Sequence, residues 1–308
     1  MIARKIGAID LGSNSLRLLI ALVEGQNLLY LRSELRETRL GEKLLPGGPL
    51  YPPARERTLA ALSALLCIMK QEQVSEGEVV ATSAVREAGD GTAFLSEAAG
   101  ISPYPVRLLT EREEAYYGFK GAIKGTVTAA SAENFLVLDF GGRSSEFSWQ
   151  EQGVFRYCSL PLGAVSLTEA FYPGSRRTLE QLNSLQENVK RLMNLQKDLS
   201  AAATHRDLVG LGGTVTTLAM LALGLECFVP GCVDDLRLPK KDIDDLERVL
   251  RCSSPAQRAH LLPFAPQRAH IIVAGAAALS TLLEYLEKEY IRVSEQGLLH
   301  GLLNVKLY

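Results

Sequence analysis

Hydrophobic residues in the first half of the chain follow two spacings, one typical of strands and one typical of helices. Residues 6–10 and 16–23 are apolar runs joined by the polar stretch 11–15, which predicts two strands and a turn. Residues 28–35 are predicted as a third strand, and apolar residues at helical spacing predict a helix at 55–73. The rest of this half is expected to form a strand at 78–84, a helix at 86–99, a strand at 107–109 and a helix at 111–123.

The same order of elements begins again after residue 134. An apolar run at 135–139, a glycine and serine turn at 140–145 and a second run at 146–149 predict another pair of strands. Further predicted elements are a long amphipathic helix at 178–203, a strand at 207–211, helices at 214–223, 240–250 and 271–289, a strand at 291–293 and a helix at 297–305. Strands that alternate with helices in this way predict an α/β fold.

A short internal repeat links the two halves. The segment Ile-Asp-Leu-Gly-Ser-Asn-Ser at 9–15 aligns with Leu-Asp-Phe-Gly-Gly-Arg-Ser at 138–144. Each copy is an apolar strand that ends in Asp and continues into Gly and small polar residues. A match of this length is compatible with chance as well as with duplication. Duplication would mean two similar lobes facing each other.

Composition narrows the class of protein. The chain has 308 residues, 47% of them hydrophobic, which is enough for a sizeable core and suggests two domains. Its net charge of -2 gives no overall basic field, so we expect no nucleic-acid partner, and an anionic substrate would need a local site. The five cysteines form no CxxC pair, which indicates a reducing compartment without structural disulfides.

Two apolar stretches could suggest membrane insertion. Residues 208–225 carry no charge, but their glycines and threonines favour a strand, a turn and a helix over a membrane span. The apolar N-terminal stretch is interrupted by Asp10 and Arg17, which is not typical of a signal peptide. We therefore expect a soluble cytoplasmic protein with no membrane partner.

Three turns are rich in small residues. Such turns direct several backbone N–H groups outward and can bind phosphate oxygens. Each alone is an ordinary hairpin or strand-to-helix turn, but three in one chain favour a site for a polyanion. The turns are Gly12 to Ser15, Gly141 to Ser145 and Gly212-Gly213-Thr214.

Several charged residues are placed where they could act on phosphates. Asp10 and Asp139 each end an apolar strand, where a carboxylate either holds a hydrated Mg²⁺ or starts a turn; for Asp139, close to Glu146, we favour the metal. Arg17 lies inside an apolar strand and Arg86 follows one, so both could reach into a site. Taken alone, the acidic pair at 113–114 and the single residue His300 are better explained by structural roles.

These motifs together resemble the exopolyphosphatase and guanosine pentaphosphate phosphohydrolase (Ppx/GppA) family. The matching segments run almost from end to end and are 8–17, 39–42, 81–88, 113–115, 139–146, 159–165 and 212–214. The resemblance implies two ribonuclease-H-like lobes of the actin, Hsp70 and sugar-kinase type with a cleft between them. It places residues 1–124 plus 291–308 in the first lobe and residues 125–290 in the second.

The resemblance also implies an activity. The expected reaction is attack of water on the terminal phosphate of inorganic polyphosphate or of pppGpp, a nucleotide of the stringent response. Mg²⁺ is the implied cofactor, and a requirement for a monovalent cation stays open. Homodimers are common among such relatives. The alternative is a low-activity or inactive protein that senses polyphosphate or guanosine penta- and tetraphosphate.

Roles follow from the family by position. Glu114 would be the general base, Glu146 a second essential carboxylate, and Asp139 and Asp10 the metal-binding residues. The residues implied in phosphate binding are Ser13, Asn14, Arg17, Arg86, Gly141, Gly142, Arg143, Ser144, Ser145, Gly212, Gly213 and Thr214.

Four positions depart from the family pattern. Arg143 stands where the second phosphate motif usually has a third glycine, and Asp90, Leu299 and His300 replace other typical residues. Arg143 would either add positive charge to the substrate site or fill the turn and weaken hydrolysis. An active phosphohydrolase and a binding sensor therefore both remain open.

Overall fold

Each half of the chain forms a mixed β-sheet of its own. The structure, a computed structural model, describes residues 4–25, 27–126, 132–172, 174 and 177–306. The chain divides into unit 1, residues 1–121 with 298–308, and unit 2, residues 122–297.

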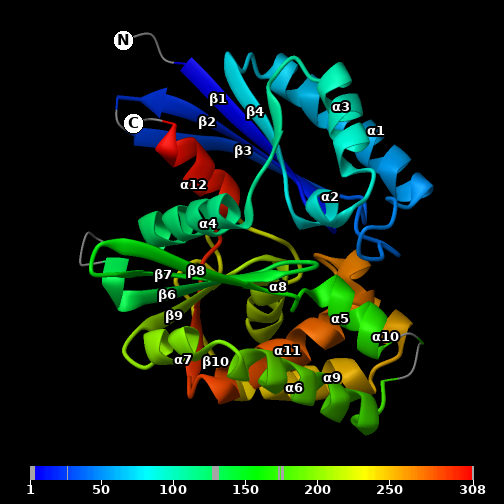
Figure 1. Ribbon diagram of the computed structural model, residues 1–308, viewed down its shortest axis with the longest axis vertical. Coiled ribbons are helices and arrows are strands. Elements are labelled where there is room, and N and C mark those ends of the chain that lie inside the picture. The colour runs from blue at the N-terminus through cyan, green and yellow to red at the C-terminus, as the bar shows by residue number, and fades with distance from the viewer. Residues whose placement is uncertain (1–3, 26, 127–131, 173, 175–176, 307–308) are drawn as a thin grey trace. The chain divides into compact units, whose positions relative to one another are not determined.

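Unit 1 contains a five-stranded sheet with the order β3-β2-β1-β4-β5 (Figure 1). Its strands are β1 (Arg4–Leu11), β2 (Ser15–Glu24), β3 (Asn27–Glu37), β4 (Glu76–Ala81) and β5 (Val106–Leu108). Its helices are α1 (Pro52–Gln71), α2 (Ser83–Glu87), α3 (Gly91–Ile101) and α12 (Leu298–Val305), and α4 (Glu111–Thr126) begins in this unit.

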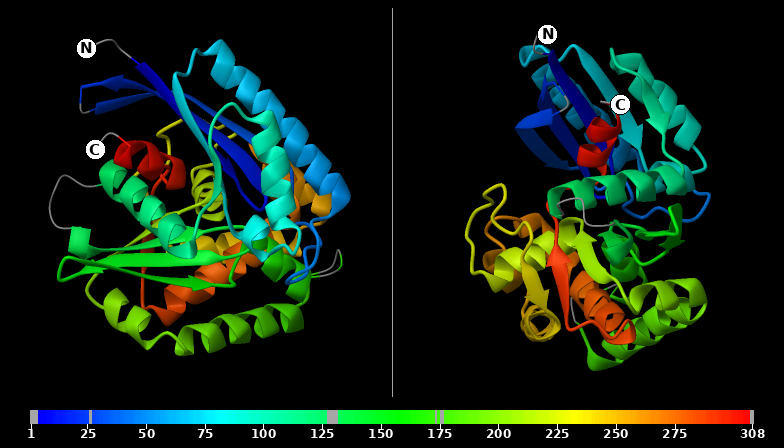
Figure 2. Two further views of the ribbon diagram at one scale, coloured as in Figure 1. Left: turned by 45° about the horizontal axis from the view of Figure 1, so that its top comes forward. Right: turned by 90° about the vertical axis from the view of Figure 1, so that its left-hand side faces the viewer.

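Both faces of the unit 1 sheet are covered, because side chains alternate along each strand. On β1, Ile9 and Leu11 pack in the core that contains α1 and α3, whereas Ile6 and Ala8 pack in the core that contains α12. Figures 1 and 2 show α1 and α3 on one face of this sheet and α12 on the other. The C-terminal helix is therefore part of the unit in which the chain begins.

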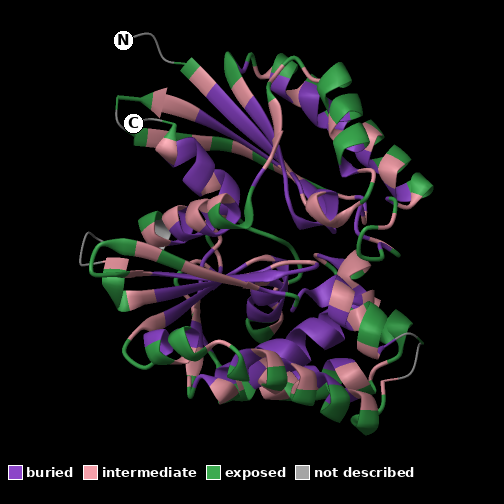
Figure 3. Ribbon diagram, viewed as in Figure 1, coloured by how far each residue is buried: buried purple, intermediate pink, exposed green. Residues whose placement is uncertain are grey.

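Unit 2 contains a six-stranded sheet with the order β10-β11-β9-β6-β7-β8. Its strands are β6 (Phe135–Phe140), β7 (Ser145–Glu151), β8 (Val154–Leu160), β9 (Asp207–Leu211), β10 (Arg237–Pro239) and β11 (Tyr290–Val293). Its helices are α5 (Ala164–Phe171), α6 (Leu179–Asn194), α7 (Lys197–Ala203), α8 (Gly213–Ala222), α9 (Lys240–Cys252), α10 (Pro255–Leu261) and α11 (Ile272–Tyr285), with 3₁₀ turns at Ala132–Asn134 and Pro266–His270. The apolar helix α11 is buried along most of its length, as Figure 3 shows.

The two sheets repeat one arrangement. In unit 1, β1 pairs antiparallel with β2 and parallel with β4; in unit 2, β6 pairs antiparallel with β7 and parallel with β9. Asp10 lies opposite Arg17 in the first hairpin, and Asp139 lies opposite Glu146 in the second. The aligned residues of the sequence repeat therefore occupy the same places, which confirms the repeat and the predicted α/β fold.

Several elements differ from the predictions: α5, α10 and β10 were not predicted, and the predicted helix 86–99 is two helices, α2 and α3. The predicted helix 178–203 is broken at residues 195–196. There the N–H groups of Leu195 and Gln196 donate to the carbonyls of Leu192 and Met193, three residues back instead of four. The apolar face continues into α7, so its periodicity does not reveal the break. Strand β8 was not predicted, because it is half exposed and carries several polar residues.

A further difference is the return of the chain to unit 1. Residues 291–308 were assigned to the first lobe, but β11 pairs with β9 and β10 in the unit 2 sheet, and unit 1 resumes only at residue 298. A strand of this length gains its backbone partners from the nearest open sheet edge, which the sequence does not identify. Residues 307–308 lie outside the described part of the chain.

Candidate functional site

The carbonyl groups of the turn between β1 and β2 are hydrogen-bonded to the segment 38–41. The carbonyl of Asn14 accepts hydrogen bonds from the N–H groups of Thr38 and Arg39 at 3.1 and 2.9 Å, and the carbonyl of Ser13 accepts from Gly41 at 2.8 Å. Because the N–H of a trans peptide points opposite to its carbonyl, the turn directs the N–H groups of these peptides away from that segment. This is the geometry that an anion-binding turn requires.

The same turn is tied to helix α2. The hydroxyl oxygens of Ser13 and Ser83 are 2.9 Å apart, and both residues are buried. Ser83 begins α2, and Arg86 lies at the end of this short helix. The predicted phosphate-binding residues Ser13 and Arg86 are therefore linked through one helical turn.

Arg86 holds the carboxylate of Glu114. Its Nη1 donates to Oε2 of Glu114 at 3.0 Å and to the carbonyl of Leu109 at 3.0 Å. Glu114 is only 9% exposed, so this charge-assisted bond fixes its orientation. The carboxylate predicted to be the base is thus a held and mostly buried group.

The neighbouring acid Glu113 has a different task. Its carboxylate accepts bonds from the N–H and the hydroxyl of Thr110, each at 2.9 Å, and its own N–H donates to the Thr110 hydroxyl. This reciprocal pattern is a capping box, which starts α4. The sequence pattern Thr-x-x-Glu at 110–113 carries this information, and it separates the two acids that sequence analysis left together.

In unit 2, the turn between β6 and β7 packs on the start of α5 in the same way. The carbonyls of Gly141, Gly142 and Arg143 accept from the N–H groups of Ala164, Val165 and Gly163 at 3.1, 2.7 and 3.0 Å.

Ser145 differs from the other predicted binding residues. It is fully buried and donates from its hydroxyl to the carbonyl of Leu162 at 2.9 Å. It holds the turn in place, so its side chain does not serve as a phosphate ligand in this conformation, whereas Ser144 retains 9% exposure.

A row of polar residues crosses the unit 2 sheet beside this turn. Asp139, Glu146 and Ser159 lie opposite one another on β6, β7 and β8, and the Ser159 hydroxyl donates to Glu146 at 3.1 Å. Residues directly opposite on adjacent strands point to the same face, and like charges there repel. Two carboxylates placed in this way favour a nearby cation.

This arrangement fits Mg²⁺ better than a closed metal cage. Among the described residues, no group of three or more His, Cys, Asp and Glu side chains could hold a metal ion. Mg²⁺ typically uses one or two protein carboxylates together with water and substrate phosphates. Asp139 and Glu146 supply that donor set.

The third turn begins α8 and lies against the same carboxylate. A methyl group placed on Gly212 would stand 3.1 Å from Oδ1 of Asp139, which shows how close the turn lies to that side chain. Thr214 is 2% exposed and packs against Gly275 of α11.

The turn also brings in Arg268, a residue that sequence analysis missed. A methyl group on Gly213 would overlap the guanidinium of Arg268, with contacts of 1.8 to 2.4 Å. Only glycine allows this approach. Arg268 lies in the 3₁₀ turn Pro266–His270, and no motif around it in the sequence signals a role.

Arg17, on β2, lies close to His300 of α12. The His300 ring packs edge-on against the Tyr30 ring with centroids 4.7 Å apart. Burial, together with the positive charge of Arg17, lowers the pKa of His300 to about 4. His300 is therefore neutral near pH 7 and adds no second positive charge beside Arg17.

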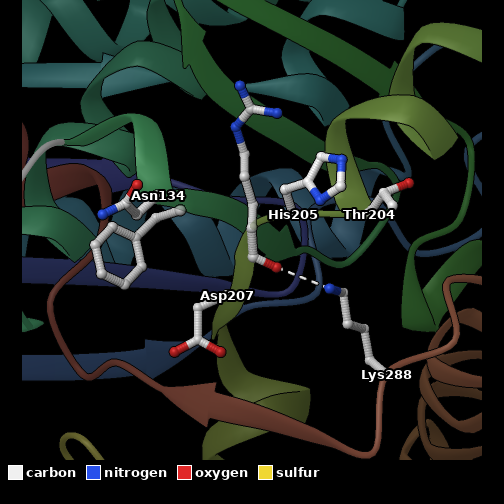
Figure 4. Close-up of a pocket in the computed structure, with 7 residues that line it drawn as sticks. Asn134, Thr204, His205, Asp207 and Lys288 are labelled. Atoms are coloured by element: carbon white, nitrogen blue, oxygen red, sulfur yellow. Dashed lines mark hydrogen bonds between the residues drawn. The ribbon is translucent and has the colours of Figure 1, made fainter.

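A separate pocket of about 440 Å³ lies in unit 2, away from these turns. Figure 4 shows Lys288 directed toward the backbone oxygen of Arg206, to which its Nζ donates at 2.8 Å. The pocket lies at the N-terminal ends of β6 and β9, whereas ligands of α/β sheets bind at the C-terminal ends of the strands. Its lining residues are Asn134, Phe135, Thr204, His205, Arg206, Asp207 and Lys288.

The structure thus groups the predicted residues into two sets, each within its own unit. In unit 1 the turn after Asp10 is joined to Arg86 and Glu114, and in unit 2 the turn after Asp139 lies beside Glu146 and the turn at Gly212. Two such turns on similar α/β units are typical of proteins that bind phosphate groups.

Comparison with known proteins identifies the family. Residues 19–307 match the Ppx/GppA phosphatase family. Exopolyphosphatase 2 of Mycobacterium tuberculosis is 31% identical over 316 residues, which cover 98% of each chain. The chain therefore belongs to the Ppx/GppA phosphatase family, as the resemblance predicted.

Solved structures agree with this assignment. The Ppx/GppA enzyme of Aquifex aeolicus is 28% identical, with a TM-score of 0.79 over 99% of this chain and 100% of that one. An exopolyphosphatase from Cytophaga hutchinsonii shares the fold with a TM-score of 0.89, 22% identity and coverage of 99% and 98%. Helices long and apolar enough to cross a bilayer are absent from the described ranges, and residues 208–225 form β9, a turn and α8 as predicted.

Proposed function

We propose that this protein is a phosphohydrolase that releases the terminal phosphate of a linear polyphosphate. The observation that carries the proposal is the repeated Asp-x-Gly turn. In both units its carbonyls accept hydrogen bonds from the backbone of another segment, so its N–H groups point the other way. Membership of a phosphatase family and the similarity to an exopolyphosphatase support the same reaction class.

In the proposed reaction, water attacks the terminal phosphorus atom and the bond to the bridging oxygen breaks. The products are inorganic phosphate and a chain shorter by one phosphate. Glu114, held by Arg86, orients the water and accepts its proton. Phosphoryl transfer depends mainly on such positioning and on charge neutralisation.

Charge neutralisation is assigned to both sets of residues. The outward N–H groups of the turns after Asp10 and Asp139 bind phosphate oxygens, with Arg17 and Arg268 as cationic partners. Asp139 and Glu146 would hold a hydrated Mg²⁺, which when bound neutralises charge on the phosphate oxygens.

The test is phosphate release by the purified protein from long-chain polyphosphate and from pppGpp, with Mg²⁺. We expect Glu114→Gln to lower kcat about a thousandfold, since it removes the proton acceptor and keeps the size of the side chain. Glu113→Gln is the matched control: it changes the adjacent acid, which caps α4, and should leave kcat within a few-fold.

The outcomes separate the open alternatives. Release that persists in Glu114→Gln would remove Glu114 from the mechanism. Binding of polyphosphate or pppGpp by the wild-type protein with no release from either would support the sensor. A higher kcat/KM for pppGpp than for polyphosphate would reassign the substrate within the same chemistry.

A further inference from the structure

Arg143 occupies the turn position of unit 2 that Asn14 occupies in unit 1. The alignment of Asp10 with Asp139 and of Arg17 with Glu146 fixes this equivalence. Both residues have their backbone carbonyls bound by the segment behind the turn. Both are also buried, with 8% exposure for Asn14 and 7% for Arg143.

The side-chain amide of Asn14 lacks a hydrogen-bond donor for its oxygen. Its Oδ1 is buried and has no hydrogen-bond partner in the structure. A buried polar atom of this kind is costly, and a bound ligand is one way to satisfy it. The unsatisfied amide makes this turn position a candidate for contact with a ligand, and the repeat places Arg143 in the equivalent position.

Arg143 forms a long ion pair with Glu169 of α5. Its Nη1 lies 3.7 Å from Oε2 of Glu169 on α5, which is within ion-pair range but too long for a hydrogen bond. The Glu169 side chain is 40% exposed, so water weakens this attraction. A phosphate with more than one negative charge can compete with such a partner.

The backbone around Arg143 is fixed by contrast. Its carbonyl accepts from the N–H of Gly163 and the hydroxyl of Ser166, at 3.0 and 2.9 Å. A methyl group on Gly163 would come within 2.3 Å of the Arg143 backbone, so the two segments pack without space between them. The guanidinium thus extends from a rigid base, which suits a residue that selects among ligands.

We propose that Arg143 is a specificity-determining residue that binds a second phosphate of the substrate, next to the one held by the turn, and that Glu169 competes for it. This inference rests on the proposed function. It predicts a preference for substrates with several consecutive phosphates over those with few.

The test measures KM and kcat for tripolyphosphate and for long-chain polyphosphate. We expect Arg143→Met to raise KM for the long chain about tenfold with kcat nearly unchanged, since binding in the ground state and the transition state is lost equally. Glu169→Gln should lower KM a few-fold, and this gain should vanish in the Arg143→Met, Glu169→Gln double variant. Arg156→Gln is the control, because Arg156 forms a similarly loose pair with Glu151 at 3.8 Å.

Direct binding of long-chain polyphosphate to the Glu114→Gln protein keeps this test independent of turnover. Weaker binding after the added change Arg143→Met supports the proposal even if Glu114 is not the base. Unchanged or tighter binding, or a rise in kcat/KM in Arg143→Met, would show that Arg143 fills the turn rather than binding substrate. A Glu169→Gln gain that persists without Arg143 would remove Glu169 from the proposal.

Discussion

In unit 1 the strand that ends in Asp10 lies opposite Arg17, whereas in unit 2 the strand that ends in Asp139 lies opposite Glu146. The first hairpin places an acid opposite a base, and the second places two carboxylates opposite each other. Duplication preserved the backbone and let the facing residue change sign. Under the proposed function, the first arrangement would bind phosphate directly and the second would bind it through a cation.

The turns show the same divergence. In both turns the carbonyls are hydrogen-bonded to another backbone segment. The same turn position, however, holds a neutral amide, Asn14, in unit 1 and a cation, Arg143, in unit 2. The Nη1 of Arg143 lies 3.7 Å from Oε2 of Glu169 on α5. The equivalent turn positions of the two units therefore differ in charge as well as in size.

The largest expected effect tests whether Mg²⁺ belongs to unit 2. Asp139→Asn should lower phosphate release about a thousandfold at limiting Mg²⁺ and raise the half-saturating Mg²⁺ concentration, because it removes a metal ligand. Asp10→Asn should shift that concentration less, since Arg17 already faces Asp10. Equal shifts in the two variants would show that both units hold metal.

The next effect concerns His300 and Arg17 of unit 1. The pKa of His300 is about 4 in the folded protein, below its ordinary value of 6.5, so the unfolded chain binds more protons between these pH values. The contribution of His300 to the free energy of unfolding should therefore be fully present above about pH 6.5. The free energy of unfolding should fall by up to about 3 kcal/mol as the pH drops toward 4. Urea denaturation across this range measures the loss.

Two variants separate this titration from that of the carboxyl groups. His300→Gln should flatten the pH dependence of the free energy of unfolding relative to the wild type. Arg17→Met should raise the pKa of His300, because it removes the nearby positive charge. An unchanged slope in His300→Gln would mean that other groups cause the loss.

A smaller effect is expected where Arg268 crosses Gly213. Gly213→Ala should destabilise the protein by about 1–3 kcal/mol and weaken substrate binding, since the new methyl group displaces the guanidinium. Asp10 pairs with Val80 as Asp139 pairs with Leu211, so the unit 1 residue that corresponds to Gly213 is Thr82. Thr82 already carries a β-carbon, so Thr82→Ala should cost less. Thermal denaturation and KM for polyphosphate measure the two effects, and an unaltered KM in Gly213→Ala would exclude Arg268 from binding.

The smallest effect concerns Ser145. Ser145→Ala removes the bond to the Leu162 carbonyl and should lower the free energy of unfolding by about 1 kcal/mol. Its effect on KM should be slight, because the hydroxyl is turned into the protein. A large rise in KM at unchanged stability would return Ser145 to the phosphate-binding residues.

Local pattern predicted most of the elements, because hydrophobic periodicity reports directly on which face of a strand or helix is buried. It missed β8, where half-exposed polar residues hide the strand, and the short elements α5, α10 and β10. It also failed at residues 195–196, where the apolar face continues through a break. It also misplaced β11, since sheet membership depends on partners far away in sequence.

By itself, the sequence determined the α/β class, the repeat of Asp-x-Gly turns and the family, because these depend on residue type and spacing. Only the tertiary structure separated Glu113 from Glu114, turned Ser145 inward and brought Arg268 onto Gly213. It also showed that Asp10 lies opposite Arg17, whereas Asp139 lies opposite Glu146. These distinctions depend on strand register and on contacts between segments that are distant in sequence. Such contacts leave no periodic pattern along the chain, so the sequence does not reveal them.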